Sequence, residues 1–207
     1  MKRLGIFGGT FDPIHRGHLH LAREFFQRLE LDSLLLVPTK RPTHKSAPHL
    51  ADAQHRLAMC RLAVEPFGYA VSDIEVNRDS ASYTVLTLQE IGRQYPGWEL
   101  FFLMGEDMFW TVERWKEPEK IFRLAQLCVA PRSREEDGME RLSAYAEELR
   151  RKGARVRIQP IPYFPVSSTD VRKALENDGG LEGLVPPAVE SYIQVHQVYD
   201  FRKGLQA

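Results

Sequence analysis

The chain has 207 residues, of which 43% are hydrophobic and 27% charged, an ordinary composition for one globular domain with a sizeable core. Its 28 basic and 28 acidic residues balance, which argues against nucleic-acid or anionic-membrane partners and leaves any anion site to be local. Cys60 and Cys128 lack paired spacing and no run approaches 18 apolar residues, so we expect reduced thiols, no signal peptide, no membrane span and a cytoplasmic protein.

Apolar runs typical of strands alternate with amphipathic segments along the chain. The predicted strands are Lys2–Phe7, Leu34–Val37, Ala70–Val76, Leu100–Met104, Leu127–Ala130 and Arg155–Ile158. The predicted helices are Gly17–Glu30, Ala51–Val64, Tyr83–Gln94, Met139–Lys152, Thr169–Asn177 and a last helix that a proline starts within Val185–Ile193. Residues Ser133–Gly138 are charged and predicted to form a loop.

Continuously apolar strands indicate a parallel sheet that helices cover on both faces. We therefore expect an α/β, doubly wound, Rossmann-like fold, with ligands at the carboxyl ends of the strands. The prediction is one domain over residues 1–207, with a C-terminal helical part from about residue 168 packing on it.

The segment after the first strand, Gly8–His18, is the strongest motif. Two glycines allow close backbone approach to a ligand, and the following helix directs its N–H groups and positive dipole end at the turn. His15 and His18 add two side-chain donors on the same side. The segment matches neither a dinucleotide fingerprint nor a P-loop, yet it predicts a phosphate site. The alternative is that the histidines only cap or pack.

A second motif, Pro165–Arg172, comes late in the chain. Ser167 and Asp170 have capping-box spacing, so the segment predicts a helix N-terminus. The hydroxyls of Ser168 and Thr169, with the Arg172 guanidinium, could form a second clamp for phosphates. The alternative is a well-capped helix with a surface arginine.

These two motifs resemble the nucleotidylyltransferase superfamily, as T-F-D-P-x-H-x-G-H at residues 10–18 and S-S-T-x-x-R at 167–172. The resemblance implies that His15, His18 and Arg172 are catalytic. His15 and His18 would hold the ATP phosphates, His18 would stabilise the transition state at the α-phosphate, and Arg172 would take the leaving pyrophosphate. The implied ATP-binding residues are Gly8, Gly9, Thr10, Phe11, Ser168 and Thr169.

Further elements resemble the bacterial nicotinate mononucleotide adenylyltransferase family, including V-P-x-x-V-x-x-Y-I at residues 185–193. The matches are His44 and Lys45 of P-P-H-K, Thr84 of S-Y-T, Gly105 and Asp107 of G-x-D, and Trp115. Departures from the family pattern are Thr43, Leu86 and Glu106. The resemblance implies that His44, Lys45, Thr84 and Trp115 bind the mononucleotide, and that Gly105 and Asp107 hold the ATP ribose region.

Each of these elements also has a plainer interpretation. The basic loop at residues 40–45 could be solvated, Ser82–Thr84 could cap a helix, and Gly105–Asp107 could be a simple turn. Trp110 is assigned to the core, whereas Trp115 suits stacking on a pyridine ring.

The implied reaction joins ATP and nicotinate mononucleotide into deamido-NAD and releases pyrophosphate, in NAD biosynthesis. A dianionic 5′-phosphate needs no general base, so catalysis would come from positioning and charge stabilisation. We expect Mg²⁺ to arrive with ATP, because the sequence shows no dense carboxylate cluster.

Other functions stay open on the sequence. Phosphopantetheine adenylyltransferases share both phosphate motifs, although they would have no use for a Thr84 and Trp115 pocket. Cytidylyltransferases share H-x-G-H. Class I aminoacyl-tRNA synthetases have a related H-I-G-H element, but this chain lacks K-M-S-K-S and a basic RNA face. A non-catalytic nucleotide-binding regulator is the remaining alternative. The degree of nicotinate preference and the oligomeric state are not encoded in these motifs.

Overall fold

A computed structural model describes residues 1–41, 50–132 and 136–199. Its strands form one parallel sheet in the order β3-β2-β1-β4-β5-β6. The strands are β1 Arg3–Gly9, β2 Ser33–Pro38, β3 Ala70–Val71, β4 Glu99–Gly105, β5 Gln126–Ala130 and β6 Val156–Ile158. This topology confirms the predicted doubly wound fold.

Helices connect the strands and cover the sheet. The α-helices are α1 Arg16–Arg28, α2 Ala53–Val64, α3 Thr84–Gln94, α4 Glu106–Phe109, α5 Pro118–Leu124, α6 Glu136–Arg151, α7 Ser168–Glu176 and α8 Pro187–His196. Two single 3-10 turns, η1 Glu65–Phe67 and η2 Val112–Arg114, complete the described elements.

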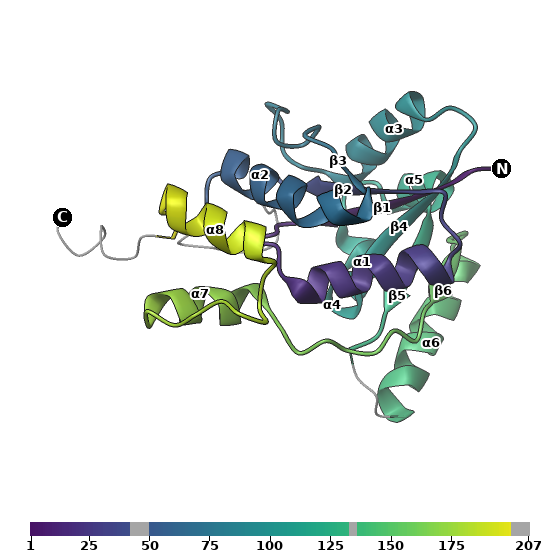
Figure 1. Cartoon of the computed structure of the whole chain (residues 1–207). Coiled ribbons are helices and arrows are strands. Elements are labelled where there is room, and N and C mark those ends of the chain that lie inside the picture. The colour runs from purple at the N-terminus through teal and green to yellow at the C-terminus, as the bar shows by residue number, and fades with distance from the viewer. Residues whose placement is uncertain (42–49, 133–135, 200–207) are drawn as a thin grey trace.

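Successive strand residues bury their side chains on opposite faces of the sheet. On β4, Phe101 and Leu103 point into a core shared with α1, α2, α7 and α8, whereas Leu100 and Phe102 point into a core shared with α3, α4, α5 and α6. Both faces are therefore apolar, which explains the continuously apolar strands. Figure 1 shows α1 and α2 crossing the near face of the sheet.

The strand order places a topological switch point between β1 and β4. From β1 the chain continues outward to β2 and β3, then returns to pair β4 on the other side of β1. Connections leave this point in opposite directions, and in open α/β sheets ligands bind at the carboxyl ends of the strands beside such a point. In Figure 1, α7 and α8 lie at this end of the sheet, opposite the N-terminus.

Some predicted elements differ from the structure. Only Ala70–Val71 of the predicted strand 70–76 pairs with β2. After the Ser72 N–H donates to the Leu36 carbonyl the chain turns, and Ile74 and Val76 are buried without pairing in the sheet. The predicted loop 133–138 was wrong from Glu136 onward, where α6 begins. The short helices α4 and α5 were not predicted.

Candidate active site

The turn after β1 is closely packed against the protein itself. Phe11 adopts a left-handed backbone with φ 49°, the Asp12–Pro13 peptide is cis, and the Phe11 ring is buried against Phe7. A Cβ on Gly9 would lie 2.9 Å from the Phe11 ring. The glycine therefore allows this internal packing, a reason separate from the ligand approach expected from sequence.

His15 and His18 cap α1 reciprocally. The His18 N–H donates to His15 Nδ1 and the His15 N–H donates to His18 Nδ1, both at 3.3 Å, and the rings stack with centroids 3.7 Å apart. Both histidines thus cap the helix, which is one part of the alternative interpretation. The cap does not exclude ligand binding, because a neutral imidazole that accepts at Nδ1 carries its proton on Nε2 and donates from there.

Burial keeps His15 neutral. Its side chain is 6% exposed, and loss of hydration lowers its pKa to about 4, against a smaller opposing effect of Asp170. At neutral pH this residue therefore acts as a hydrogen-bond donor without a positive charge.

The N-terminus of α1 offers fewer amides than the sequence suggested. The Arg16 N–H donates to the Leu184 carbonyl at 2.8 Å, and the His18 N–H is used in the cap. Gly17 brings the helix close to the chain before α7, where a Cβ would lie 2.9 Å from the Val166 carbonyl oxygen. Helix docking therefore uses part of the predicted anion site.

The two phosphate motifs, far apart in sequence, lie in contact. The Ser168 hydroxyl donates to the Pro13 carbonyl at 3.0 Å, and Arg172 Nη1 donates to the Asp12 carbonyl at 2.5 Å. Ser167 and Asp170 form the predicted capping box of α7. Exposed Thr169 accepts a 3.4 Å hydrogen bond from Arg172. The structure therefore brings Ser168, Thr169 and Arg172 to the turn that carries the histidines.

Arg56 on α2 holds three chain segments together and was missed by the sequence analysis. Its side chain is 0% exposed, and its guanidinium donates at 2.7–2.9 Å to backbone carbonyls. The four acceptors are the carbonyl oxygens of Thr10, Thr39, Lys40 and Ala51. Burial lowers the pKa of Arg56, and nearby Asp12 opposes this shift. The sequence around Arg56 does not distinguish it from Arg61 on the same helix, so it gives no signal for such a role.

Asp12 is a second buried polar centre. Its side chain is 5% exposed, and its Oδ1 accepts hydrogen bonds from the Ala51 N–H at 3.1 Å and from the Tyr199 hydroxyl at 2.7 Å. Its Oδ2 lies 3.6 Å from Arg172 Nη1. Tyr199 was not predicted as a site residue.

The turn after β4 is more open. A Cβ on Gly105 would meet no atom within 4 Å, and the residue has an ordinary φ of −80°. Glu106 accepts the Arg132 N–H at 2.7 Å, and the Asp107 carboxylate pairs with the Arg132 guanidinium. Both members of this ion pair are more than half exposed. No contact among the described residues requires Gly105 to be glycine, which is consistent with a ligand passing there.

Thr84 and Trp115 adjoin residues that are in contact, Tyr83 and Lys116, on the face of the sheet that α3 covers. Thr84 is the first residue of α3, whose N-cap Tyr83 makes no side-chain capping bond, so the capping interpretation of this element is wrong. Lys116 Nζ lies 4.5 Å from the centre of the Tyr83 ring. Trp115 is 7% exposed and packs edge-on against Phe102. It is therefore more buried than Trp110, the tryptophan that was assigned to the core.

A buried carboxyl group supports the first turn of α3. Glu75 is 7% exposed and accepts a 2.7 Å hydrogen bond from the Thr87 hydroxyl, which in turn accepts from Arg78 at 3.0 Å. Burial raises the pKa of Glu75, and the Thr87 hydrogen bond opposes this rise. The Ser82 hydroxyl lies beside this carboxyl group without a hydrogen bond of ordinary geometry. No sequence pattern indicated this network.

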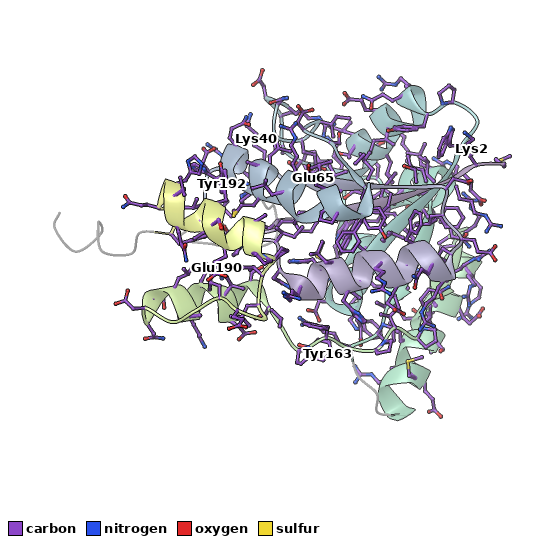
Figure 2. The ribbon with its side chains drawn as sticks, in the orientation of Figure 1. Lys2, Lys40, Glu65, Tyr163, Glu190 and Tyr192 are labelled. Atoms are coloured by element: carbon purple, nitrogen blue, oxygen red, sulfur yellow. The ribbon has the colours of Figure 1, made fainter. Side chains whose placement is uncertain are left out.

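His44 and Lys45 lie outside the described residues. On one side of that segment, Lys40 donates to the Arg78 carbonyl at 2.7 Å. Figure 2 labels Lys40 at the same end of the sheet as Tyr192 of α8. On the other side, Ala51 contacts Arg56 and Asp12. Within the described ranges, no group of three or more His, Cys, Asp or Glu could hold a metal ion.

Known proteins resemble the chain over nearly its whole length. Residues 6–174 match the family described as cytidylyltransferase-like. A protein of Neisseria meningitidis serogroup B named probable nicotinate-nucleotide adenylyltransferase is 40% identical over 97% of this chain and 100% of its own. One of Thermomicrobium roseum with the same name is 39% identical, over 96% of this chain and 92% of its own.

Solved structures support the same fold. Plasmodium falciparum nicotinic acid mononucleotide adenylyltransferase complexed with NaAD superposes with a TM-score of 0.77 at 21% identity, covering 97% of this chain and 98% of that one. The motifs at the switch point and the full-length relatives agree with this likeness. The chain therefore belongs to the cytidylyltransferase-like family and, among its members, to the nicotinate-nucleotide adenylyltransferases.

Proposed function

We propose that the protein transfers the adenylyl group of ATP to nicotinate mononucleotide, forming deamido-NAD and pyrophosphate in NAD biosynthesis. The observation that carries the proposal is the contact between the two phosphate motifs: Ser168 and Arg172 of α7 bond to the turn that leads into His15 and His18. Full-length relatives at 40% identity have the name of this activity.

The proposed reaction needs charge control and positioning more than proton transfer. A 5′-phosphate oxygen of the mononucleotide attacks the α-phosphorus of ATP, a new P–O bond forms, and the bond to the bridging oxygen breaks as pyrophosphate leaves. The nucleophile is mostly dianionic at pH 7, so no base is required. The protein must hold two anions together and stabilise the leaving charge.

Each residue of the two phosphate motifs is assigned a role that its geometry allows. The Nδ1 atoms of His15 and His18 accept backbone N–H groups, so the Nε2–H groups are the donors assigned to ATP phosphates. His18 is assigned to the α-phosphate in the transition state. The hydroxyls of Ser168 and Thr169 and the remaining N–H groups of Arg172 are assigned to the β- and γ-phosphates. Mg²⁺ would arrive with ATP, held by phosphate oxygens and water.

The ATP ribose and the mononucleotide are assigned to the other side of the switch point. Open space beside Gly105 and the exposed carboxylate of Asp107 suit the ribose region. Thr84 at the start of α3 and Trp115 are assigned to the pyridine ring. His44 and Lys45 are assigned to the rest of the mononucleotide. Because Trp115 is buried, only an edge or a shifted ring could contact the base.

The proposal extends to the whole chain as one unit. Helices α7 and α8 bury Val171, Val189 and Ile193 in the same core as α1 and α2, which supports the proposal that the chain forms one catalytic domain over residues 1–207. No helix in the described parts is long and apolar enough to cross a membrane, and we place the reaction in the cytoplasm with small-molecule substrates.

The test is pyrophosphate release from ATP and Mg²⁺ in parallel reactions with nicotinate mononucleotide, nicotinamide mononucleotide and 4′-phosphopantetheine. We expect the highest kcat/KM with nicotinate mononucleotide. Release with phosphopantetheine alone would retain the phosphate roles and reject those of Thr84 and Trp115. Absence of release with every acceptor, while ATP binding persists, would identify a nucleotide-binding regulator.

A further inference from the structure

We propose that Tyr199, three residues beyond the end of α8, is a positioning residue for the phosphate side of this site and acts through Asp12. The inference rests on the proposed function, because it assigns the Asp12 turn and Arg172 to the phosphates of ATP. Neither the phosphate motifs nor the elements matched to the mononucleotide include Tyr199.

Donors from three distant segments surround Asp12. Its Oδ1 accepts the Tyr199 hydroxyl at 2.7 Å and the Ala51 N–H at 3.1 Å. Its Oδ2 lies 3.6 Å from Arg172 Nη1, which also donates to the Asp12 carbonyl at 2.5 Å. One carboxylate thus joins the β1–α1 turn to the start of α2, to α7 and to the chain beyond α8.

Burial makes an unpaired carboxylate at Asp12 costly in free energy. Asp12 is 5% exposed and Tyr199 is 9% exposed, and a buried carboxylate is tolerated only when its oxygens accept hydrogen bonds or face a cation. Burial, and secondarily the charge of Asp12, hold the pKa of Tyr199 well above its usual range. The phenol therefore remains a donor throughout the working pH range.

Loss of the Tyr199 hydroxyl would leave Asp12 with one fewer donor next to Arg172. The carboxylate would then rely more on Arg172, and movement of either group displaces the turn that runs from Asp12 into His15. The groups affected are those assigned to the ATP phosphates. The expected defect is therefore in the chemical step, while recognition of the pyridine base at α3 is unaffected.

Tyr199→Phe removes one hydroxyl, and Tyr192→Phe is its matched control. Tyr192 lies on α8 at the same end of the molecule (Figure 2) and its hydroxyl bonds to His55 Nδ1 at 3.0 Å, away from Asp12. We expect Tyr199→Phe to lower kcat about tenfold, the scale for one hydrogen bond to a buried charged group. The KM for nicotinate mononucleotide should stay within about twofold, and Tyr192→Phe should leave both constants within the same limit.

The role of Asp12 is tested by combining substitutions. Asp12→Asn keeps the shape and an acceptor oxygen but removes the charge opposite Arg172. If Tyr199 acts through Asp12, adding Tyr199→Phe to Asp12→Asn should lower kcat by less than about twofold more, because the two changes affect one interaction. Independent effects that multiply would overturn the proposal.

Two further outcomes separate this inference from the proposed function. Equal losses of kcat in Tyr199→Phe and Tyr192→Phe, tracking equal losses of melting temperature, would show a purely structural role and overturn it. If the unmodified protein releases no pyrophosphate with any acceptor, the proposed function fails. The inference is then tested by the affinity for MgATP, measured by calorimetry. Tyr199→Phe must weaken this affinity and Tyr192→Phe must leave it unchanged.

Discussion

The two sides of the switch point are built differently. The phosphate side, defined as the β1–α1 turn with the N-terminus of α7, has a buried Asp12, a buried Arg56 and reciprocally capped histidines. The base side, defined as the start of α3, the β4–α4 turn and Trp115, has an uncapped helix start, an exposed Asp107–Arg132 pair and open space beside Gly105. Its buried polar groups, Glu75 and Thr87, support α3 from within the fold.

This contrast follows from what each side is proposed to bind. Phosphate groups carry charge that must be met by donors fixed in advance, since reorganising polar groups during the reaction would raise the barrier. A pyridine ring and a ribose are held by apolar contact and a few adjustable polar groups. Substitutions on the phosphate side should therefore have large effects, and exposed polar substitutions on the base side small ones.

Arg56→Met should have the largest effect on stability. It removes four hydrogen bonds to backbone carbonyls and leaves Asp12 with less positive charge nearby. We expect the free energy of unfolding to fall by about 3–5 kcal/mol, measured by urea denaturation.

Arg61→Met is the matched control for Arg56→Met. Arg61 lies on the same helix, but it is half exposed and forms a 3.6 Å ion pair with exposed Asp73, so its loss should change the free energy of unfolding by less than about 1 kcal/mol. Comparable losses in the two variants would show that Arg56 does not organise the loops.

His18→Ala should have the largest effect on the reaction. Loss of one donor to a developing phosphate charge lowers kcat by about 10²–10³. The same change removes one half of the α1 cap, worth about 1 kcal/mol of stability, so kcat is measured on protein shown to be folded. His20→Ala on the same helix, where the ring contacts the Pro162 carbonyl, should retain near-normal kcat. Normal turnover in His18→Ala would remove this residue from the mechanism.

His15 should make the phosphate side sensitive to acid. Its pKa in the folded protein is about 4, against an ordinary 6.5, so the unfolded chain binds more protons between these values. Stability should therefore be highest above pH 6.5 and fall by about 3 kcal/mol as the pH drops to 4.

His15→Asn keeps a good N-cap residue but cannot titrate. Its free energy of unfolding should vary less steeply between pH 6.5 and 4 than that of the unmodified protein. Chemical denaturation at several pH values measures both slopes, and equal slopes would contradict the assigned burial of a neutral imidazole.

Arg132→Ala should have the smallest effect. The Asp107–Arg132 pair is exposed on both sides, so its removal should change stability by less than about 1 kcal/mol and the KM for ATP by less than about threefold. The stability and the KM for ATP of the unmodified protein should likewise change little with salt concentration. A loss of tenfold or more in kcat/KM for ATP would mean that Arg132 contacts the nucleotide, and that the base side is as highly organised as the phosphate side.

Local patterns in the sequence predicted local structure well. Ser167 and Asp170 form the expected capping box, and the last helix begins at Pro187 as expected. These features depend on residues three or four positions apart, so their partners are visible in the sequence. The mutual cap of His15 and His18 has the same spacing and could have been expected by the same rule. The strand predicted for 70–76 failed because apolar residues mark burial, and burial does not require pairing.

The sequence by itself determined the order of strands and helices, the two phosphate motifs and the family resemblance. Tertiary structure alone decided that Arg56 joins three chain segments, that Tyr199 bonds to Asp12 and that Ser168 bonds to Pro13. The longest of these contacts join residues 46 to 187 positions apart, and the sequence around one partner does not indicate which residue is the other. They form because strand order and helix docking bring the carboxyl ends of the strands and α7 together, where buried polar groups must find partners.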